Sequence, residues 1–185
     1  MLTMKKLFTI ITVLLAIGGL SGCATNEAKQ SDKAEADNAA LEIYEMHHEN
    51  RIYVFYDRKL LKEFQAVGET PFRLTRIGVG PNGETMVFGL TKHDKKMKKP
   101  IPAIELYDGK IKADAIYAEM YKHGRIYVFN NFDDMKTVRN FGHPNFMFTQ
   151  IGAGPKGETV VYVLNKSNKK KRPDALIEDF KRHNS

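Results

Sequence analysis

The sequence predicts an α+β protein made of two tandem ββαββα repeats, with antiparallel sheets, helices on one face and a pseudo-twofold axis between the copies. One observation behind this prediction is a nearly identical turn segment, IGVGPNGET at residues 77–85 and IGAGPKGET at residues 151–159. In addition, β-prone runs flank each turn, and a capped amphipathic segment precedes it in both copies. One supersecondary unit repeated at a fixed interval accounts for all of these features.

The repeat also predicts the domain boundaries. Residues of one copy match those 74 positions later, and the match runs without a gap from Glu45 to beyond Lys96. We therefore expect a first repeat module at residues 41–110 and a second at residues 111–185. The 185-residue chain is 42% hydrophobic, which is enough for two small modules that share one core.

Each module is expected to open with two strands joined by a tight turn. In the first module the β-prone runs are residues 43–48 and 51–55, and Glu49-Asn50 separates them where the second module has His123-Gly124. Asn and Gly tolerate the positive φ that a two-residue hairpin turn requires. In residues 51–55, Ile52 and Val54 would point to one face of the sheet and Tyr53 and Phe55 to the other. Apolar side chains on both faces predict a central strand covered on both sides. A helix over residues 39–48 is the alternative to the first strand.

A short amphipathic helix is expected after the second strand of each module. Asp57 and Asn131 occupy N-cap positions, and Gly68 and Gly142 stand where a helix can end in the left-handed conformation. The apolar positions expected to face the core are Leu61, Phe64 and Val67 in the first module and Met135, Val138 and Phe141 in the second. Capping residues and apolar spacing therefore agree in both copies.

The repeated turn is expected to join a second hairpin, residues 72–77 with 85–90 and residues 146–151 with 159–164. The turn residues are Gly78, Gly80, Pro81 and Gly83 in the first copy, and Gly152, Gly154, Pro155 and Gly157 in the second. These glycines match the G-x-G-x-x-G pattern of dinucleotide-binding proteins, in which they open a helix that receives the pyrophosphate. Here a β-prone run follows instead, so we interpret the glycines as structural.

Glu84 and Glu158 follow the two turns and are the candidate catalytic residues, because two symmetry-related carboxylates can form an acid–base pair. Their neighbours differ too little to separate two pKa values, so bonding to backbone N–H groups of their own turn is the favoured interpretation. His47, His48 and Glu49 are the densest group of ligand-type side chains, but adjacent residues of a strand point to opposite faces. We expect neither a metal site nor a cofactor.

Each module is expected to close with a lysine-rich loop and an apolar helix that begins near Pro100 or Pro173. The two loops hold the candidate binding residues: Lys92, Lys95, Lys96, Lys98 and Lys99 in the first, and Lys166, Lys169, Lys170, Lys171 and Arg172 in the second. A lysine is a mobile point charge that attracts phosphate or carboxylate, so the loops predict an anionic partner. Solvated charge that keeps strand ends soluble is the alternative.

The N-terminus contains Lys5 and Lys6, then an apolar run at residues 7–20, and then Ser21-Gly22-Cys23. The apolar run is shorter than the roughly 20 residues of a membrane-spanning helix. This segment resembles the signal peptide of bacterial lipoproteins, whose lipobox is matched by Leu20, Ser21, Gly22 and Cys23. The resemblance implies that residues 1–22 are removed and that the Cys23 thiol is acylated, for example by palmitate. An uncleaved anchor helix is the alternative.

The resemblance also implies a location. A neutral residue after the lipidated cysteine, here Ala24, is typical of outer-membrane lipoproteins, which face the periplasm; in a Gram-positive cell the protein would lie on the outer face of the cell membrane. Residues 23–40 are then a lipidated cysteine and a flexible tether, because the segment has no large apolar side chain. Loss of Lys5 and Lys6 lowers the net charge from +7 to +5.

These observations predict a non-enzymatic, lipid-anchored envelope lipoprotein whose tandem domain binds an acidic glycan, a lipid headgroup or an envelope protein. Nucleic acid is not expected outside the cytoplasm. Cys23 is the only cysteine, and Ser167 and Ser185 are the only serines after residue 40, so a cysteine or serine nucleophile has no support. The alternative function is a lipid-anchored enzyme that acts on cell-wall or glycan material through Glu84 or Glu158.

Overall fold

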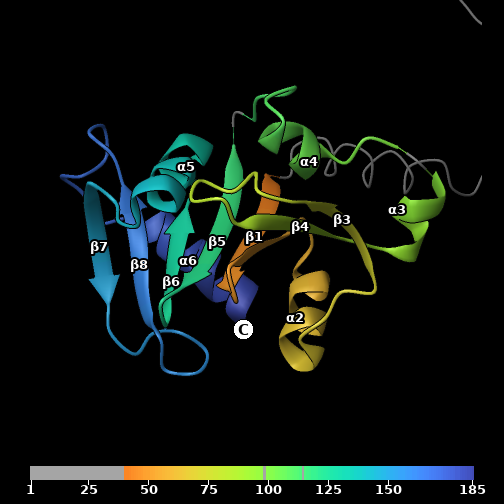
Figure 1. The fold of residues 1–185 in the computed structure, drawn as a ribbon. Coiled ribbons are helices and arrows are strands. Elements are labelled where there is room, and N and C mark those ends of the chain that lie inside the picture. Colours follow the sequence, from red (N-terminus) through yellow and green to blue (C-terminus); the bar gives the residue numbers. More distant parts are fainter. Residues whose placement is uncertain (1–39, 98, 114) are drawn as a thin grey trace, which may run out of the picture. The chain divides into compact units, whose positions relative to one another are not determined.

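The protein is seen in a computed structural model that describes residues 40–97, 99–113 and 115–185 (Figure 1). Within it, Ala40–Ser185 form one compact unit. The predicted signal peptide, Cys23 and the tether up to residue 39 lie outside the described residues. The strands are β1 (Leu41–His48), β2 (Arg51–Phe55), β3 (Phe72–Arg76), β4 (Thr85–Leu90), β5 (Ile116–Lys122), β6 (Arg125–Phe129), β7 (Phe146–Gln150) and β8 (Thr159–Leu164). The helices are α2 (Arg58–Val67), α3 (Lys92–Met97), α4 (Pro102–Tyr107), α5 (Phe132–Phe141) and α6 (Asp174–Asn184).

The strands form one mixed sheet in the order β3-β4-β2-β1-β5-β6-β8-β7. The predicted hairpin pairs β1–β2, β3–β4, β5–β6 and β7–β8 are antiparallel. The prediction of antiparallel sheets is nevertheless wrong, because β1–β5, β2–β4 and β6–β8 are parallel. Two neighbouring parallel strands must be joined by a long crossover connection. For β2 and β4, the segment that contains α2 and β3 is this connection. Hairpin signals in the sequence do not reveal which strand the crossover returns to.

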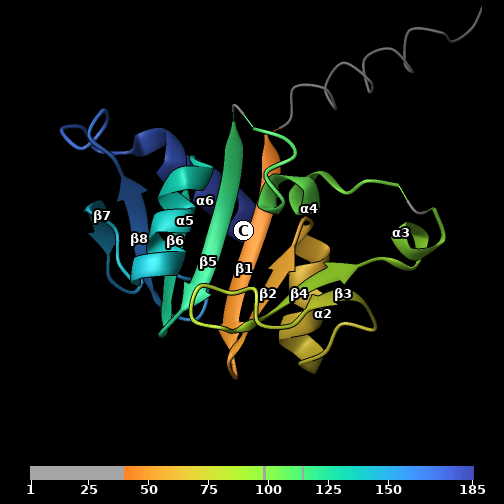
Figure 2. The same cartoon turned by 45° about the horizontal axis from the view of Figure 1, so that its top comes forward.

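The helices cover both faces of the sheet, so the prediction that they lie on one face is also wrong (Figure 2). On one face, here called face A, α4 and α5 pack through Leu106, Met135 and Val138. On the other, face B, α2 and α6 pack through side chains that include Phe64 and Phe180. Face A is therefore covered by α4 from residues 41–110 and α5 from residues 111–185. Face B is covered by α2 from the first of these segments and α6 from the second.

This exchange follows from the central β1–β5 pair. Residues 74 positions apart point to opposite faces: Val54 is in the core of face A and Val128 in that of face B, whereas Tyr53 lies on face B and Tyr127 on face A. The strand order is mirrored about β1–β5, and this pair is parallel. The segments before and after this pair therefore present corresponding sequence positions to opposite faces of the sheet.

The strands at the centre of the sheet agree with the sequence analysis. Residues 41–48 are the strand β1, so the alternative helix is wrong. β2 lies between β4 and β1, and its last four residues, Ile52–Phe55, are buried as predicted for a strand covered on both sides. β6 has the same burial pattern in the second half.

Helices α2 and α5 begin and end as predicted. The Asp57 side chain accepts a hydrogen bond from the Lys59 backbone N–H, and Asn131 Oδ1 accepts bonds from the N–H groups of the second and third residues after it, at 2.9 and 3.1 Å. Gly68 and Gly142 are left-handed, with φ of 82° and 84°. Each glycine N–H closes the helix by donating to a carbonyl of the last turn, which is the expected glycine C-cap.

The predicted core positions of these helices are right except at the last position. Leu61, Phe64, Met135 and Val138 are buried. Val67 and Phe141, by contrast, are 76% and 72% exposed. Both stand directly before the glycine cap, where helical spacing alone overestimates burial.

Candidate functional site

The two predicted lysine-rich loops have different local structures. The first contains helix α3, whose start is capped because the Thr91 N–H donates to Asp94 Oδ2 at 2.7 Å while the Asp94 N–H donates to Thr91 Oγ1 at 3.1 Å. The second, residues 166–172, has turns at residues 166–170 and a bend at residue 171. Lys98 lies outside the described residues. The other predicted binding residues are exposed: Lys92, Lys95, Lys96, Lys99, Lys166, Lys169, Lys170, Lys171 and Arg172.

One lysine of each segment lies over an aromatic ring of a neighbouring strand. Lys95 Nζ is 5.7 Å from the ring centre of Phe72, and Lys169 Nζ is 4.1 Å from that of Phe146. Exposed cation–π contacts of this kind contribute on the order of 0.5–1 kcal/mol. These two lysines therefore have a local structural contact in addition to their charge.

Both lysine-rich segments lie at the same end of the sheet. They follow the C-terminal ends of β4 and β8, and the strand pairing places those ends at the same end of the sheet as the first residues of β1 and β5. Figures 1 and 2 show α3 on one flank of the sheet and the segment after β8 on the other. The segments thus form two separate cationic regions that flank the start of β1.

Glu84 and Glu158 belong to separate turns, between β3 and β4 and between β7 and β8, and Glu84 but not Glu158 lines a hollow that contains His47, His48 and His123. Glu84 Oε2 accepts a hydrogen bond from the Asn82 backbone N–H, and Glu158 Oε2 accepts one from the Lys156 backbone N–H, each at 2.7 Å. Desolvation opposes ionisation of Glu84, but bonds from the Asn82 side chain and backbone outweigh it and lower the Glu84 pKa. Both carboxylates are thus bound within their own turns.

Gly80 and Gly154 allow these carboxylates to approach the backbone. A Cβ atom at Gly80 would lie 2.6 Å from Glu84 Oε2, and one at Gly154 would lie 2.5 Å from Glu158 Oε2. The flanking turn glycines have positive φ: Gly78, Gly83, Gly152 and Gly157. Because β4 and β8 follow the turns, each glycine pattern leads into a strand rather than into the helix of a dinucleotide site.

The predicted histidine group is divided between two environments. His47 Nε2 lies 2.6 Å from Glu45 Oε1, whereas His48 Nε2 lies 3.5 Å from Glu49. The parallel β1–β5 pair also brings His123 to the hollow lined by His47 and His48, which has a volume of about 360 Å³. Among the residues placed by the structure, no group of three or more His, Cys, Asp or Glu side chains could hold a metal ion.

Two buried glutamates form polar centres that the sequence analysis missed. Glu45 on β1 and Glu119 on β5 are both 0% exposed. Glu45 lies on face A, where its Oε2 accepts hydrogen bonds from Arg139 Nε at 2.8 Å and from the Tyr107 hydroxyl at 2.7 Å. Arg139 Nη2 also lies 2.8 Å from this oxygen, as an ion pair whose orientation does not allow a hydrogen bond.

Glu119 has a different set of partners on face B. Its Oε1 accepts hydrogen bonds from Arg58 Nη1 at 3.0 Å, from the Tyr117 hydroxyl at 2.5 Å and from Asn184 Nδ2 at 2.8 Å. The Tyr121 hydroxyl donates to Oε2. Four donors from β5, α2 and α6 therefore surround this carboxylate.

The charge of Arg139 decides the ionisation of Glu45. Burial raises the pKa of Glu45, but Arg139 and the bonds from His47 and Tyr107 outweigh burial and hold that pKa at about 2. Burial, together with Glu45, also raises the pKa of Tyr107 well above 10, so its hydroxyl stays a donor. A fully buried, paired carboxylate is out of reach of a substrate, and we assign both glutamates a structural role.

A signal for these glutamates was present in the sequence. Both stand within apolar runs that were predicted to be strands, and they are 74 positions apart. A charge retained in a buried strand needs a partner, because an unpaired buried charge is costly. Their arginine partners gave no such signal, since Arg58 and Arg139 are not 74 positions apart.

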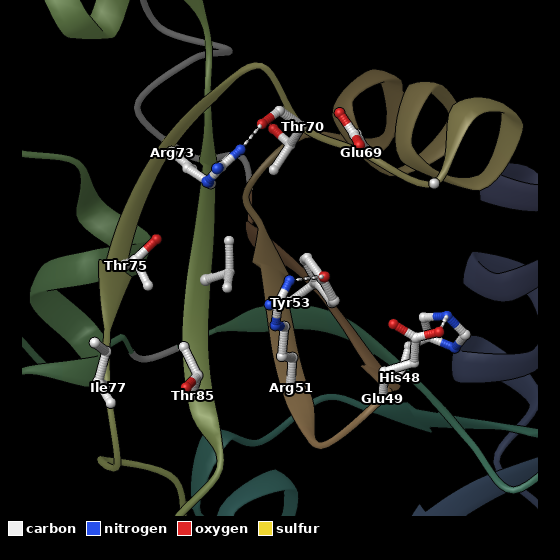
Figure 3. Close-up of a pocket in the computed structure, with 12 residues that line it drawn as sticks. His48, Glu49, Arg51, Tyr53, Glu69, Thr70, Arg73, Thr75, Ile77 and Thr85 are labelled. Carbon is white, nitrogen blue, oxygen red and sulfur yellow. Dashed lines mark hydrogen bonds and ion pairs between the residues drawn. The ribbon is translucent and has the colours of Figure 1, made fainter.

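A groove crosses face B where β2, β4 and β3 lie side by side (Figure 3). Its volume is about 550 Å³. It is lined by His48, Glu49, Arg51, Tyr53, Gly68, Glu69, Thr70, Arg73, Thr75, Ile77, Thr85 and Val87. The sequence analysis missed it because the groove depends on the order of strands that are not consecutive in the chain.

Comparisons of this chain with protein-family models, with curated proteins and with solved structures gave no match. No helix within residues 40–97, 99–113 and 115–185 is long and apolar enough to cross a membrane. Function is therefore inferred from the residues and geometry of this chain.

Proposed function

We propose that this protein is a bacterial lipoprotein that is anchored through an acylated Cys23 and binds an anionic component of the membrane surface without catalysing a reaction. The observation that supports this most strongly is that both lysine-rich segments share one end of the sheet with the first residue of β1, Leu41. The chain leads from Cys23 into β1, so this is the end of the domain to which the lipid would be attached.

Anionic lipid headgroups fit this arrangement better than the other expected partners do. The segments flank the start of β1 as two separate regions, which suits a broad planar surface more than a compact acidic ligand. Each lysine near an anionic membrane surface contributes on the order of 1 kcal/mol, and an acyl anchor with a basic patch is a recognised two-signal combination. In this proposal the protein lies on the periplasmic side of the outer membrane, or on the outer face of a Gram-positive cell membrane.

The domain itself is, in this proposal, two copies of one ββαββα unit related by a pseudo-twofold axis along the β1–β5 pair. Supporting this, β2 and β6, α2 and α5, β3 and β7, and β4 and β8 have bounds that differ by 74 residues. An axis parallel to the strands exchanges the faces of the sheet but keeps its two ends distinct. Duplication about this axis therefore accounts for two cationic segments at the same end.

The alternative, an enzyme that acts on cell-wall or glycan material, has less support. Glu84 lines a hollow that Glu158 does not line, and each accepts hydrogen bonds from its own turn. An acid–base pair would need two carboxylates that face the same reacting group.

The test has two parts, of which the first concerns the anchor. Metabolic labelling with a palmitate analogue is expected to mark the wild type and to leave Cys23→Ala unmarked. A wild type without label would contradict the anchoring proposal.

The second part measures binding of non-acylated protein, from residue 24 onward, to phosphatidylglycerol and phosphatidylcholine vesicles. We expect replacement of Lys166, Lys169, Lys170 and Lys171 by Gln to weaken binding to the anionic vesicles about tenfold or more. The matched control replaces four lysines away from that end, the exposed Lys62, Lys156 and Lys181 and the half-buried Lys122, and should bind nearly as the wild type does. Equal binding to both lipids, or an equal loss in the control, would contradict headgroup binding. The wild type could instead capture an acidic protein or glycan. If the first variant loses this binding and the control variant keeps it, the partner belongs to that class.

A further inference from the structure

Three neighbouring strands form the floor of the groove on face B. The register places Tyr53 of β2 beside Val87 of β4, and Val87 beside Thr75 of β3. Tyr53 and Val87 are 7% and 3% exposed, whereas Thr75 is exposed. The floor is therefore apolar along β2 and β4 and carries a hydroxyl on β3.

An arginine stands toward each end of this floor (Figure 3). Arg51 of β2 lies beside Thr85, two residues before Val87 on β4, and Arg73 of β3 lies beside Gly89, two residues after it. The two arginines are thus separated by four residues along β4, or about 13 Å along the strand direction. Two distinct cationic positions result, with the apolar floor between them.

Each guanidinium is oriented by a hydrogen bond to a groove residue. Arg51 Nη1 donates to the Tyr53 hydroxyl at 3.4 Å, and Arg73 Nη1 donates to the Thr70 carbonyl at 3.1 Å. A guanidinium has five N–H donors, so one bond fixes its direction and leaves donors for a ligand. Arg51 and Arg73 are both exposed, so a ligand can reach them.

The acidic residues of the groove stand at its rim. Glu49 belongs to the β1–β2 turn, where it pairs with His48, and Glu69 directly follows the glycine cap of α2. Figure 3 shows both on the opposite side of the groove from Thr75. Arg51 and Arg73 are therefore the charged side chains that β2 and β3 contribute to the groove, and Glu49 acts on the charge of Arg51 from the turn.

We propose that this groove binds a small elongated organic anion with an oxyanion group at each end, one at Arg51 and Thr85 and the other at Arg73 and Thr75. Its apolar middle would lie on Tyr53 and Val87. Arginine binds the paired oxygens of a carboxylate or phosphate through two parallel N–H donors. A volume of about 550 Å³ is in the ordinary range for a small-molecule site. This inference is independent of the anchor and of the lysine-rich segments.

The other half of the domain supplies an internal control. Seven of the twelve groove residues recur there, among them Arg125, Tyr127 and Thr149, but Met147 stands at the position equivalent to Arg73. The equivalent of Gly89 is Val163, whose side chain is buried on face A. Only one of the two arginines is therefore present in the second half, and a dianion should bind to the first half alone.

The proposal is tested by isothermal titration calorimetry on the full chain in a neutral detergent, with adipate, 1,6-hexanediol bisphosphate and hexanoate as probes. Adipate or the bisphosphate is expected to bind about tenfold or more tightly than hexanoate, because hexanoate has a single oxyanion group. Whichever of the two binds more tightly identifies the oxyanion as carboxylate or phosphate. Binding of all three probes with equal affinity, or of none, would overturn the proposal.

Variants then locate the binding. Arg73→Met, which introduces the residue of the other half, and Arg51→Gln should each reduce dianion affinity to about that of hexanoate. Arg125→Gln, the matched control, and the variant with Gln at Lys166, Lys169, Lys170 and Lys171 should retain it. Unchanged melting temperatures will show that the exposed substitutions leave the fold intact. Wild-type affinity in Arg73→Met, or an equal loss in Arg125→Gln, would contradict the assignment.

Discussion

Glu45 and Glu119 occupy equivalent positions on the two central strands, yet their charges are balanced in different ways. Arg139 reaches Glu45 from the last turn of α5, whereas Arg58 reaches Glu119 from the first residue of α2. The bounds of these two helices differ by 74 residues, but the arginines stand at opposite ends of them. A carboxylate buried at the centre of the sheet thus requires a cation, while the helix position that supplies it is free to vary.

The two centres also differ in how many neutral donors assist the arginine. Glu119 accepts hydrogen bonds from Tyr117, Tyr121 and Asn184, and its arginine side chain is 17% exposed. Glu45 has His47 and Tyr107, and its arginine side chain is 8% exposed. The face A centre should therefore depend more strongly on its cation than the face B centre does.

Among these variants, Arg139→Met is expected to cause the largest loss of unfolding free energy. It leaves Glu45 buried without a cation, and loss of one partner of a buried pair costs about 3–5 kcal/mol. Arg58→Met should cost roughly half as much, because three neutral donors still serve Glu119. Urea unfolding at pH 7 measures both free energies. A larger loss in Arg58→Met would show that the donors around Glu119 do not compensate.

The equivalent core positions of α2 and α5 offer a second comparison. Phe64→Ala should lower the unfolding free energy by about 3–5 kcal/mol, and Val138→Ala by roughly 2 kcal/mol, because the larger side chain leaves the larger cavity. Both residues are at most 3% exposed. Thermal and urea unfolding test this pair. Stability unchanged in both variants would contradict the packing of these helices on the two faces.

The pH dependence of stability sharpens the comparison at Glu45. Its pKa is about 2 in the folded protein and near 4.3 in an unfolded chain, so its contribution is fully present above about pH 5 and is lost as the pH falls toward 2. This difference corresponds to roughly 3 kcal/mol. We expect the unfolding free energy of Glu45→Gln to fall less steeply than that of the wild type between pH 5 and 2. Parallel curves for the two proteins would mean that Glu45 does not carry this dependence.

The smallest expected effect compares the two glycine turns. A Cβ at Gly80 or Gly154 would lie 2.9 Å from the Cβ of Glu84 or Glu158, so the turn must shift. Gly80→Ala and Gly154→Ala should each cost about 1–2 kcal/mol, and the two losses should agree closely. Differential scanning calorimetry measures both. A loss in one variant alone would show that the two turns are not equivalent.

Local features of this fold could be predicted from the sequence because they depend on residues a few positions apart. The N-caps at Asp57 and Asn131 and the left-handed Gly68 and Gly142 are of this kind. The hairpin on either side of the repeated turn is another. Each depends on a side chain or on backbone freedom that the sequence states directly.

The arrangement of the strands could not be predicted in the same way. Whether β4 returns beside β2, and whether β1 meets β5 in parallel, is decided by packing over long sequence separations. The exchange of faces and the groove between Arg51 and Arg73 both follow from that arrangement. Composition alone predicts the lysine-rich segments. Their position at the same end of the sheet as the start of β1 depends on the strand order, which the composition does not give.

The most direct test of the central claim is photo-crosslinking in native membranes from the two ends of the sheet. A photoreactive residue replaces either Lys170, after β8, or Lys156, in the β7–β8 turn, in the otherwise unchanged acylated protein. We predict lipid adducts from position 170, none from position 156, and loss of the adducts in Cys23→Ala. Equal lipid adducts from both positions, or adducts from position 156 alone, would contradict an anchored domain whose cationic end faces the membrane.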